Sequence, residues 1–164
     1  MSVKNAAKAI VVNDDKILLN KCKNSLGDMI WDLADGDIYY DLPGGGQKRD
    51  ETLGETVVRE CLEETGLHIV VERFAAIYEE ILINEKFKER FGFYSHKIYF
   101  IFIARLTGEL HGEIAESDFV MIGSEWVGLD EIDNVPLYPV AVKKNLRKII
   151  GSNEILFLGS EKSK

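Results

Sequence analysis

Apolar and polar residues alternate along the first third of the chain in a way that predicts strands. Two short apolar runs, Ala6–Val12 and Lys16–Cys22, flank the polar triplet Asn13–Asp15, and this order is typical of a β-hairpin. A further strand is predicted over Ile38–Leu42, and the intervening segment Lys23–Asp37 is expected to form a loop. A hairpin followed by a separate strand is therefore expected at the start of the chain.

The residues from Leu53 to Thr65 predict the first helix. This segment contains no proline, Thr52 before it can act as the N-cap, and Gly66 after it suits the left-handed conformation that ends many helices. At about 100° per residue, one arc of this helix is apolar and is expected to face the core. That arc consists of Val57, Val58, Cys61 and Leu62.

More strands are predicted after this helix. Leu67–Arg73 and Phe74–Leu82 have the pattern of strands, and His96–Leu106 is the most strand-like run in the chain and is expected to be central. The polar and aromatic segment Asn84–Tyr94 is expected to be a mobile loop that could cover a substrate. Thr107–Ser117 is expected to be a loop as well.

The C-terminal part completes the predicted fold. We expect a short strand over Glu125–Gly128, a helix over Tyr138–Ile150 with Pro139 in its first turn, and a last strand over Glu154–Leu158. Strands then precede, surround and follow a few helices, which predicts the α/β class with a mixed β-sheet sandwiched between α-helices. The length of 164 residues, without a repeat or a linker, predicts a single domain over residues 1–164.

Composition and charge narrow the possible functions. The formal net charge of −8 argues against binding a nucleic-acid polymer, whereas a small phosphorylated substrate carried with a metal ion is compatible. Residues 1–9 contain no apolar signal segment and the chain has no run of 18 apolar residues, so no membrane contact is expected. Cys22 and Cys61 lie in apolar patterns and are expected to be reduced, which favours a cytoplasmic location. A homodimer is the default expectation for the oligomeric state.

Three glutamates, Glu60, Glu63 and Glu64, share an arc beside the apolar arc of the predicted helix. Glu60 and Glu64 form a like-charged i,i+4 pair that costs about 0.2–0.5 kcal/mol, and the helix dipole disfavours anions in the last turn. Arg59 can relieve Glu63 only in the weaker orientation, and its better helical partner is Glu55. These acids form either a solvated face or a site for a hard divalent cation such as Mg²⁺. The residues alone leave both interpretations open.

A glycine loop precedes the helix. Pro43 and the run Gly44–Gly46 follow the predicted strand, and glycines after a strand let the backbone approach a ligand closely. A plain turn is the alternative. The loop is not a P-loop, because no Gly-Lys-Ser or Gly-Lys-Thr follows, and no Gly-x-Gly-x-x-Gly fingerprint opens the helix.

The loop and the helix together resemble the Nudix box of the MutT-like hydrolases. From Gly45 the chain has five residues, Glu51, seven residues, and then Arg59–Leu67, which reads Arg-Glu-Cys-Leu-Glu-Glu-Thr-Gly-Leu. Seven specified positions match by chance in about one window in 10⁸ if each residue type makes up about 7% of a protein. Two positions depart from the usual pattern: Cys61 replaces an aliphatic residue, and Asp50 stands where many members have glycine.

The resemblance implies the Nudix fold, an α/β/α sandwich. It also implies an enzyme that hydrolyses a nucleoside diphosphate linked to another moiety, with Mg²⁺ or Mn²⁺. Carried over position by position, the metal ligands would be Glu60, Glu63, Glu64 and the carbonyl of Gly44.

The resemblance also implies roles for neighbouring residues. Glu60 would act as a general base as well, Arg59 would orient the carboxylates, and Glu51 would brace the loop or assist metal binding. Family sites often include one more acid from a later loop. The candidates for it are Glu116 first, then Glu113 and Asp118, although a solvated loop acid is equally expected.

The sequence does not select the substrate. A nucleoside triphosphate is the first hypothesis, and ADP-ribose, a dinucleoside polyphosphate and a nucleotide sugar are alternatives; an mRNA cap is less favoured because a basic RNA path is missing. A second class of function is a Nudix module that binds a nucleotide without cutting it. A third is a structural protein whose acidic helix faces solvent. The intact Glu60, Glu63 and Glu64 favour the enzyme.

Overall fold

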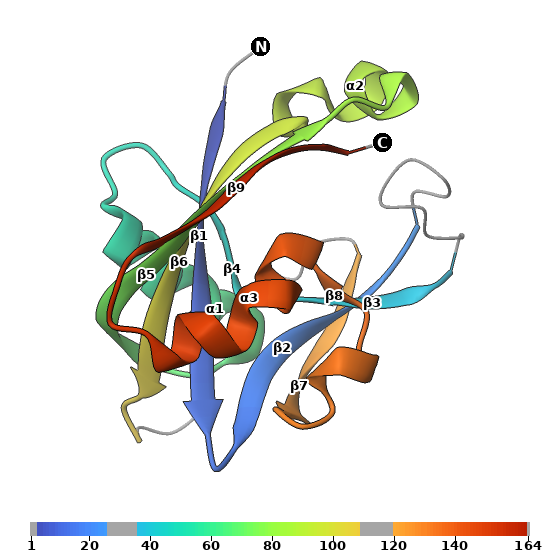
Figure 1. The fold of residues 1–164 in the computed structure, drawn as a ribbon. Helices are drawn as coiled ribbons and strands as arrows, with labels where there is room; N and C mark the ends of the chain where they lie inside the picture. Colours follow the sequence, from blue (N-terminus) through green and yellow to red (C-terminus); the bar gives the residue numbers. More distant parts are fainter. Residues whose placement is uncertain (1–2, 26–35, 109–119, 164) are drawn as a thin grey trace.

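A computed structural model describes residues 3–25, 36–108 and 120–163 of the chain. Figure 1 shows the helices and strands in these ranges, coloured from the N-terminus to the C-terminus. In chain order they are β1 (Lys4–Asn13), β2 (Lys16–Lys23), β3 (Ile38–Asp41), β4 (Gly44–Gly46), α1 (Leu53–Thr65), β5 (Ile69–Leu82), α2 (Glu85–Phe91), the 3-10 helix η2 (Gly92–Tyr94), β6 (His96–Leu106), β7 (Met121–Gly128), the 3-10 helix η3 (Ile132–Asn134), β8 (Leu137–Tyr138), α3 (Val140–Gly151) and β9 (Leu156–Ser163).

The strands form one mixed sheet. Its main path runs β8-β3-β2-β1-β6-β5-β9, with β4 paired to β1 and β7 paired to β2. The β1–β6 and β5–β9 pairs are parallel, whereas β5–β6 and β1–β2 are antiparallel. Strand β6 matches the range His96–Leu106 and lies between β1 and β5, which confirms the expectation of a central strand.

The sheet forks along one edge of β1. Near its end β1 pairs with β2 at Val12 and Asn13, while its earlier residues Ala6–Lys8 pair with the glycine strand β4. Strand β2 continues away from β1 and pairs with β3 instead. Residues between the two branches of the fork therefore have no continuous ladder of backbone hydrogen bonds beside them, and their polar groups need side-chain partners.

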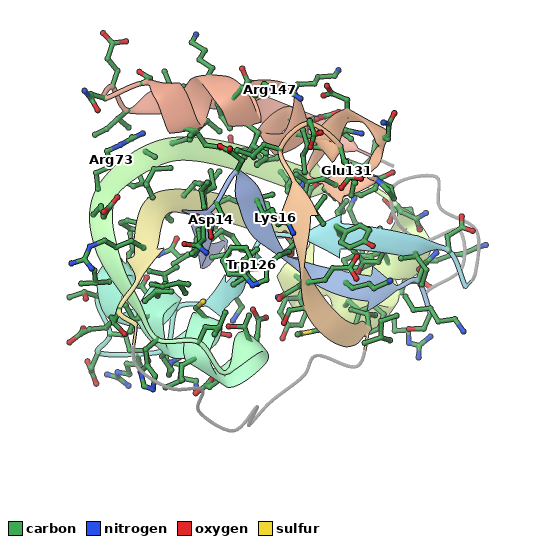
Figure 2. The ribbon with its side chains drawn as sticks, turned by 90° about the horizontal axis from the view of Figure 1, so that it is seen from below. Asp14, Lys16, Arg73, Trp126, Glu131 and Arg147 are labelled. Atoms are coloured by element: carbon green, nitrogen blue, oxygen red, sulfur yellow. The ribbon has the colours of Figure 1, made fainter. Side chains whose placement is uncertain are left out.

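Helices cover both faces of the sheet. On β1, Ala7, Ala9 and Val11 belong to a core shared with α1, whereas Ala6 and Ile10 belong to the core shared with α3. This alternation is the period of two that a strand imposes on its side chains. Figure 2 shows α3 and α1 on opposite sides of the strands. The α/β sandwich predicted from the sequence is therefore confirmed.

Helix α1 begins and ends at the predicted residues. The Thr52 hydroxyl accepts a hydrogen bond from the Glu55 amide at 3.2 Å, and the Glu55 carboxylate accepts one from the Thr52 amide at 2.8 Å. This reciprocal pair is a capping box, which satisfies two amides that have no partner inside the helix. Gly66 ends the helix with φ 71°, and its amide donates to the Leu62 carbonyl at 2.9 Å.

The predicted hairpin is confirmed, and its turn explains the two aspartates. Asp14 and Asp15 have φ values of 47° and 59°, as a two-residue type I′ turn requires. Instead of the two separate strands predicted over Leu67–Arg73 and Phe74–Leu82, the structure has the single strand β5, which begins two residues later, at Ile69. Its register shifts twice against β6, and these irregularities produced the break in the apolar pattern.

The prediction of a loop over Asn84–Tyr94 is wrong, because this segment contains α2 and η2. The Asn84 side chain caps α2 by accepting from the Phe87 amide at 3.2 Å, and Phe87 is buried. A short polar helix with one buried aromatic residue has too little apolar periodicity to be recognised from sequence. The other predicted loop was Thr107–Ser117, and its residues 109–117 lie outside the described residues.

The C-terminal predictions need small corrections. Strand β7 begins at Met121, four residues before the predicted Glu125. Pro139 is the N-cap of α3 and lies outside its first turn. Strand β9 continues to Ser163 beyond the predicted Glu154–Leu158. Among the described residues, no helix is long and apolar enough to cross a membrane.

Substituting Thr52 tests the capping of α1. Thr52→Ala removes the side-chain oxygen that accepts from the Glu55 amide, so the free energy of unfolding should fall by about 1 kcal/mol. Urea denaturation followed by circular dichroism measures this change. Thr52→Ser retains the hydroxyl and is the matched control; equal stability of the two variants would contradict the capping assignment.

Candidate functional site

Arg59 on α1 is the centre of a network of ion pairs. Its Nε and Nη2 atoms donate to the two carboxylate oxygens of Glu51 at 2.6 and 2.9 Å. Its Nη1 atom donates to Glu60 Oε1 at 2.7 Å and to Glu63 Oε2 at 2.9 Å. Nη2 also approaches the Gly46 carbonyl at 3.3 Å. One planar cation therefore joins the glycine loop, the segment before the helix and two of the three predicted carboxylate ligands.

Glu51 links the loop to the start of α1. Besides its bidentate contact with Arg59, its Oε2 atom accepts from the Lys48 amide and from the Thr56 hydroxyl, each at 3.1 Å. These partners all favour the ionised carboxylate, and the Arg59 hydrogen bond does so most strongly. They lower the pKa of Glu51 to about 2.

Glu64 is held differently, in a buried position. Its side chain accepts from Asn20 Nδ2 at 2.7 Å and from the Gly44 amide at 2.8 Å, both at Oε2, and the residue is 8% exposed. Burial raises the pKa of Glu64 to about 7, although the charge of Lys8 and the two hydrogen bonds favour ionisation. Burial and these polar partners therefore act on the ionisation of Glu64 in opposite directions.

Lys8 brings a buried positive charge to the other side of the loop. Its Nζ atom donates to Asp41 Oδ2 at 2.7 Å, to the Leu42 carbonyl at 3.0 Å and to the Gly44 carbonyl at 2.6 Å. Burial alone would lower the pKa of Lys8, but the charges of Asp41 and Glu64 outweigh it and raise the pKa above its ordinary value. The ammonium is charged at neutral pH.

Two glycines let the loop approach its neighbours closely. A Cβ on Gly44, which has φ 128°, would lie 2.1 Å from the Ala7 carbonyl oxygen, and a Cβ on Gly45 would lie 2.5 Å from Glu60 Oε2. Only glycine fits at either position without movement of the strand or of the carboxylate. Asp50, which stands where many Nudix boxes have glycine, has φ 66° and so takes the left-handed conformation.

The structure places the predicted residues together around the loop and α1. They are Gly44, Glu51, Arg59, Glu60, Glu63 and Glu64. One expected pair is wrong: Glu55 does not contact Arg59, because its carboxylate is used in the capping box with Thr52. The candidates Glu113, Glu116 and Asp118 lie outside the described residues.

Sequence reasoning missed Lys8, Asn20 and Asp41. A signal for two of them was present, since Lys8 interrupts the apolar run Ala6–Val12 and Asn20 interrupts Lys16–Cys22. A buried polar side chain in such a strand has to be paired with another polar group. The sequence does not say with which group, because the partners are more than 30 residues away.

The donor set suits a hard divalent cation. Glu60, Glu63 and Glu64 each keep one carboxylate oxygen without a hydrogen bond to any described residue; Lys48 Nζ lies 3.9 Å from that of Glu63. Carboxylate and carbonyl oxygens are the ligands that Mg²⁺ and Mn²⁺ prefer. Among the described residues, however, no three acidic, His or Cys side chains already surround one point. Arg59 holds Glu60 and Glu63, while Glu64 turns toward the loop.

A groove of about 480 Å³ lies apart from these carboxylates. Its apolar wall includes Val127 and Val135, which belong to the core on the α3 side of the sheet, and Tyr40 packs against the same core. Glu131 also lines it, and Figure 2 shows this residue near α3. The groove does not include any of the predicted ligands on α1.

Comparison with protein families identifies the family of this chain. The family model described as "NUDIX domain" matches residues 3–148. Because this match covers most of the chain, the protein belongs to the Nudix family. It is accordingly a Nudix pyrophosphohydrolase; hydrolases of this family act on small nucleotide substrates and generally use a divalent metal ion.

Solved structures support the same fold. A NUDIX hydrolase from Nitrosomonas europaea has a TM-score of 0.67 and 19% identity, with 89% of this chain and 87% of that chain covered. An ADP-ribose pyrophosphatase from Streptococcus suis has a TM-score of 0.60 and 23% identity, with 96% of this chain and 98% of that chain covered. A MutT protein from Methanosarcina mazei has a TM-score of 0.61 and 22% identity, with 93% of this chain and 96% of that chain covered. The comparison with curated proteins gave no match. These identities show a shared fold alone.

The low pKa of Glu51 predicts how stability depends on pH. This carboxylate ionises at a lower pH in the folded chain than in the unfolded chain, so it stabilises the fold above about pH 4.5. That stabilisation is lost as the pH falls through about 2. Glu51→Gln should therefore be less stable than wild type at pH 7, with the difference narrowing as the pH falls below 4.5.

Urea denaturation at pH 7, 4 and 3 in the presence of a chelator measures this difference. Glu89→Gln, which removes an exposed carboxylate from α2, is the control for the change in net charge. A difference between wild type and Glu51→Gln that is the same at all three pH values would contradict the low pKa of Glu51.

Proposed function

We propose that the protein hydrolyses nucleoside triphosphates to nucleoside monophosphates and pyrophosphate, with Mg²⁺ or Mn²⁺ as the cofactor. The observation that carries the proposal is the Arg59 network, which holds Glu51, Glu60 and Glu63 against the glycine loop. The network orders the carboxylates and leaves oxygens of Glu60 and Glu63 available to a cation.

The proposed metal ligands are Glu60, Glu63, Glu64 and the carbonyl of Gly44. A divalent ion bound there would neutralise charge on the phosphoryl oxygens and acidify a water molecule. The chain's part is to present hard oxygen ligands from a rigid helix and from a loop fixed against β1. The close approach of Gly45 to the Glu60 carboxylate supports this arrangement, because it brings helix and loop to one place.

Three residues have proposed roles in the reaction itself or in its geometry. Glu60 accepts a proton from the attacking water as general base. Arg59 orients the carboxylates of Glu60 and Glu63 through one nitrogen atom, Nη1. Glu51 fixes the Arg59 guanidinium by its bidentate contact and fixes the loop through the Lys48 amide. Splitting a phosphoanhydride depends mainly on such positioning.

ADP-ribose is the second candidate substrate. The ADP-ribose pyrophosphatase from Streptococcus suis and the MutT protein from Methanosarcina mazei resemble this chain to a similar degree, with TM-scores of 0.60 and 0.61. Both substrates contain the diphosphate bridge that the proposed site would cut, so the two candidates differ only in the group attached to it. Released pyrophosphate indicates the first substrate, and AMP with ribose 5-phosphate indicates the second.

A panel of nucleotides with Mg²⁺ tests the function. Wild type is expected to release pyrophosphate from at least one nucleoside triphosphate. Glu60→Gln keeps the shape of the side chain but removes its charge and basicity, so kcat should fall at least about 10²-fold. Glu64→Gln should also lower turnover, while Glu89→Gln on α2 should leave it unchanged.

The outcomes separate the classes of function. Wild-type turnover in both Glu60→Gln and Glu64→Gln would refute the site. A thermal shift with a nucleotide but no product would identify a binding module, and no response to metal or nucleotide would identify a structural protein.

The last two glycines of the loop, Gly45 and Gly46, offer a matched pair of variants. In Gly45→Ala the new methyl group would meet Glu60 Oε2 at 2.5 Å, so the carboxylate must move and kcat should fall by roughly 10-fold or more. In Gly46→Ala the methyl group has no atom within 4 Å and activity should stay near wild type. Steady-state kinetics at saturating Mg²⁺ measure kcat of both variants. An equal loss of kcat in the two variants would contradict the proposed packing.

A further inference from the structure

The Lys8 ammonium is fully engaged inside the protein. Its three N–H groups match three acceptors: the Asp41 carboxylate, the Leu42 carbonyl and the Gly44 carbonyl. Lys8 is only 8% exposed. The contact with the Gly44 carbonyl, at 2.6 Å, is the shortest of the three.

The Gly44 backbone is held from three directions. Its amide donates to Glu64 at 2.8 Å, its carbonyl accepts from Lys8, and its Cα hydrogens face the Ala7 carbonyl on β1. Gly44 also pairs with Lys8 in the β1–β4 register. The direction of the Gly44 carbonyl is therefore set by the strand and by the ammonium, with little freedom to turn.

This contact places a positive charge at a proposed metal ligand. A divalent ion on the Gly44 carbonyl would lie close to the ammonium that bonds the same oxygen, and two cations at such a distance repel each other strongly at a buried site. The ammonium also draws electron density from the oxygen that the metal ion would use. Repulsion between the two cations therefore opposes metal binding at the Gly44 carbonyl as long as the Lys8 contact is in place.

We infer that Lys8 is a positioning residue that competes with the divalent ion for the Gly44 carbonyl, and so weakens metal binding while ordering the loop. The inference rests on the proposed function, because Gly44 is a metal ligand only in that proposal. Asp41 holds the ammonium in place and keeps the pair neutral. The loop of the metal-free protein is thus ordered by an internal cation.

A double variant tests the competition without changing net charge. Lys8→Met with Asp41→Asn removes both charges, keeps a side chain of similar length at position 8, and keeps an oxygen at position 41 that can accept from the Leu42 amide. We expect Mn²⁺ to bind about 10-fold tighter than to wild type, since one charge-assisted hydrogen bond no longer has to be broken. Titration followed by electron paramagnetic resonance measures this affinity.

Lys21→Met is a control for the loss of a lysine charge elsewhere, because Lys21 is half-buried, pairs with Glu125 at 3.5 Å and does not touch the loop. Its Mn²⁺ affinity should stay within about 2-fold of wild type, as expected for a screened charge. Wild-type or weaker affinity in the double variant would overturn the inference, and so would an equal gain in Lys21→Met.

A measurement on the wild-type protein keeps the inference testable if the double variant does not fold. In the metal-free protein the Lys8 ammonium hydrogens should exchange slowly with water and be visible by ¹⁵N NMR. Saturating Mg²⁺ should abolish this protection, and unchanged protection would overturn the inference. The proposed function is judged separately, by product release in wild type and its loss in Glu60→Gln.

Discussion

Repulsion between carboxylates crowded around one short helix is the constraint on which the rest of the site depends. Glu60, Glu63 and Glu64 lie within two turns of α1, and Glu51 lies just before it. Arg59 balances three of these four charges with one guanidinium, and Lys8 faces the fourth from the opposite side of the glycine loop. The loop is fixed between these two cations, because each donates to one of its carbonyl groups. The same contacts that stabilise the fold therefore shape the site.

Much of α1 and its loop could be predicted because the signals are local. Thr52 and Gly66 mark the ends of the helix, and the spacing from Gly45 to Leu67 identifies the family that the domain match confirms. Each of these signals depends on residues within a few turns of one another, where propensity and capping rules apply directly. The sandwich followed from the order of strands and helices. The roles of the acidic residues, by contrast, stay predictions, as does the homodimer.

The rest depended on contacts between distant parts of the chain. Lys8 meets Asp41, and Asn20 meets Glu64, only because the fork in the sheet brings β1, β2 and the loop together. Helix α2 was missed because the Asn84 cap and one buried phenylalanine support it without a clear apolar stripe. The prediction that Arg59 pairs with Glu55 was also wrong, because other contacts of both residues are stronger. The i,i+4 rule favours Glu55, but a capping box and a bidentate contact with Glu51 are stronger than an exposed helical pair.

The turn at Asp14 and Asp15 helps to determine on which face of the sheet Lys8 lies. Its two left-handed residues fix which residues of β1 and β2 are opposite each other. A slip of one residue would send every side chain of the moved strand to the other face. In β1 the lysine would then point into the layer under α1, and an alanine would replace it beside the loop. The surface hairpin, together with the pairing of β1 with β6 and β4, thus keeps the buried cation on its side of the sheet.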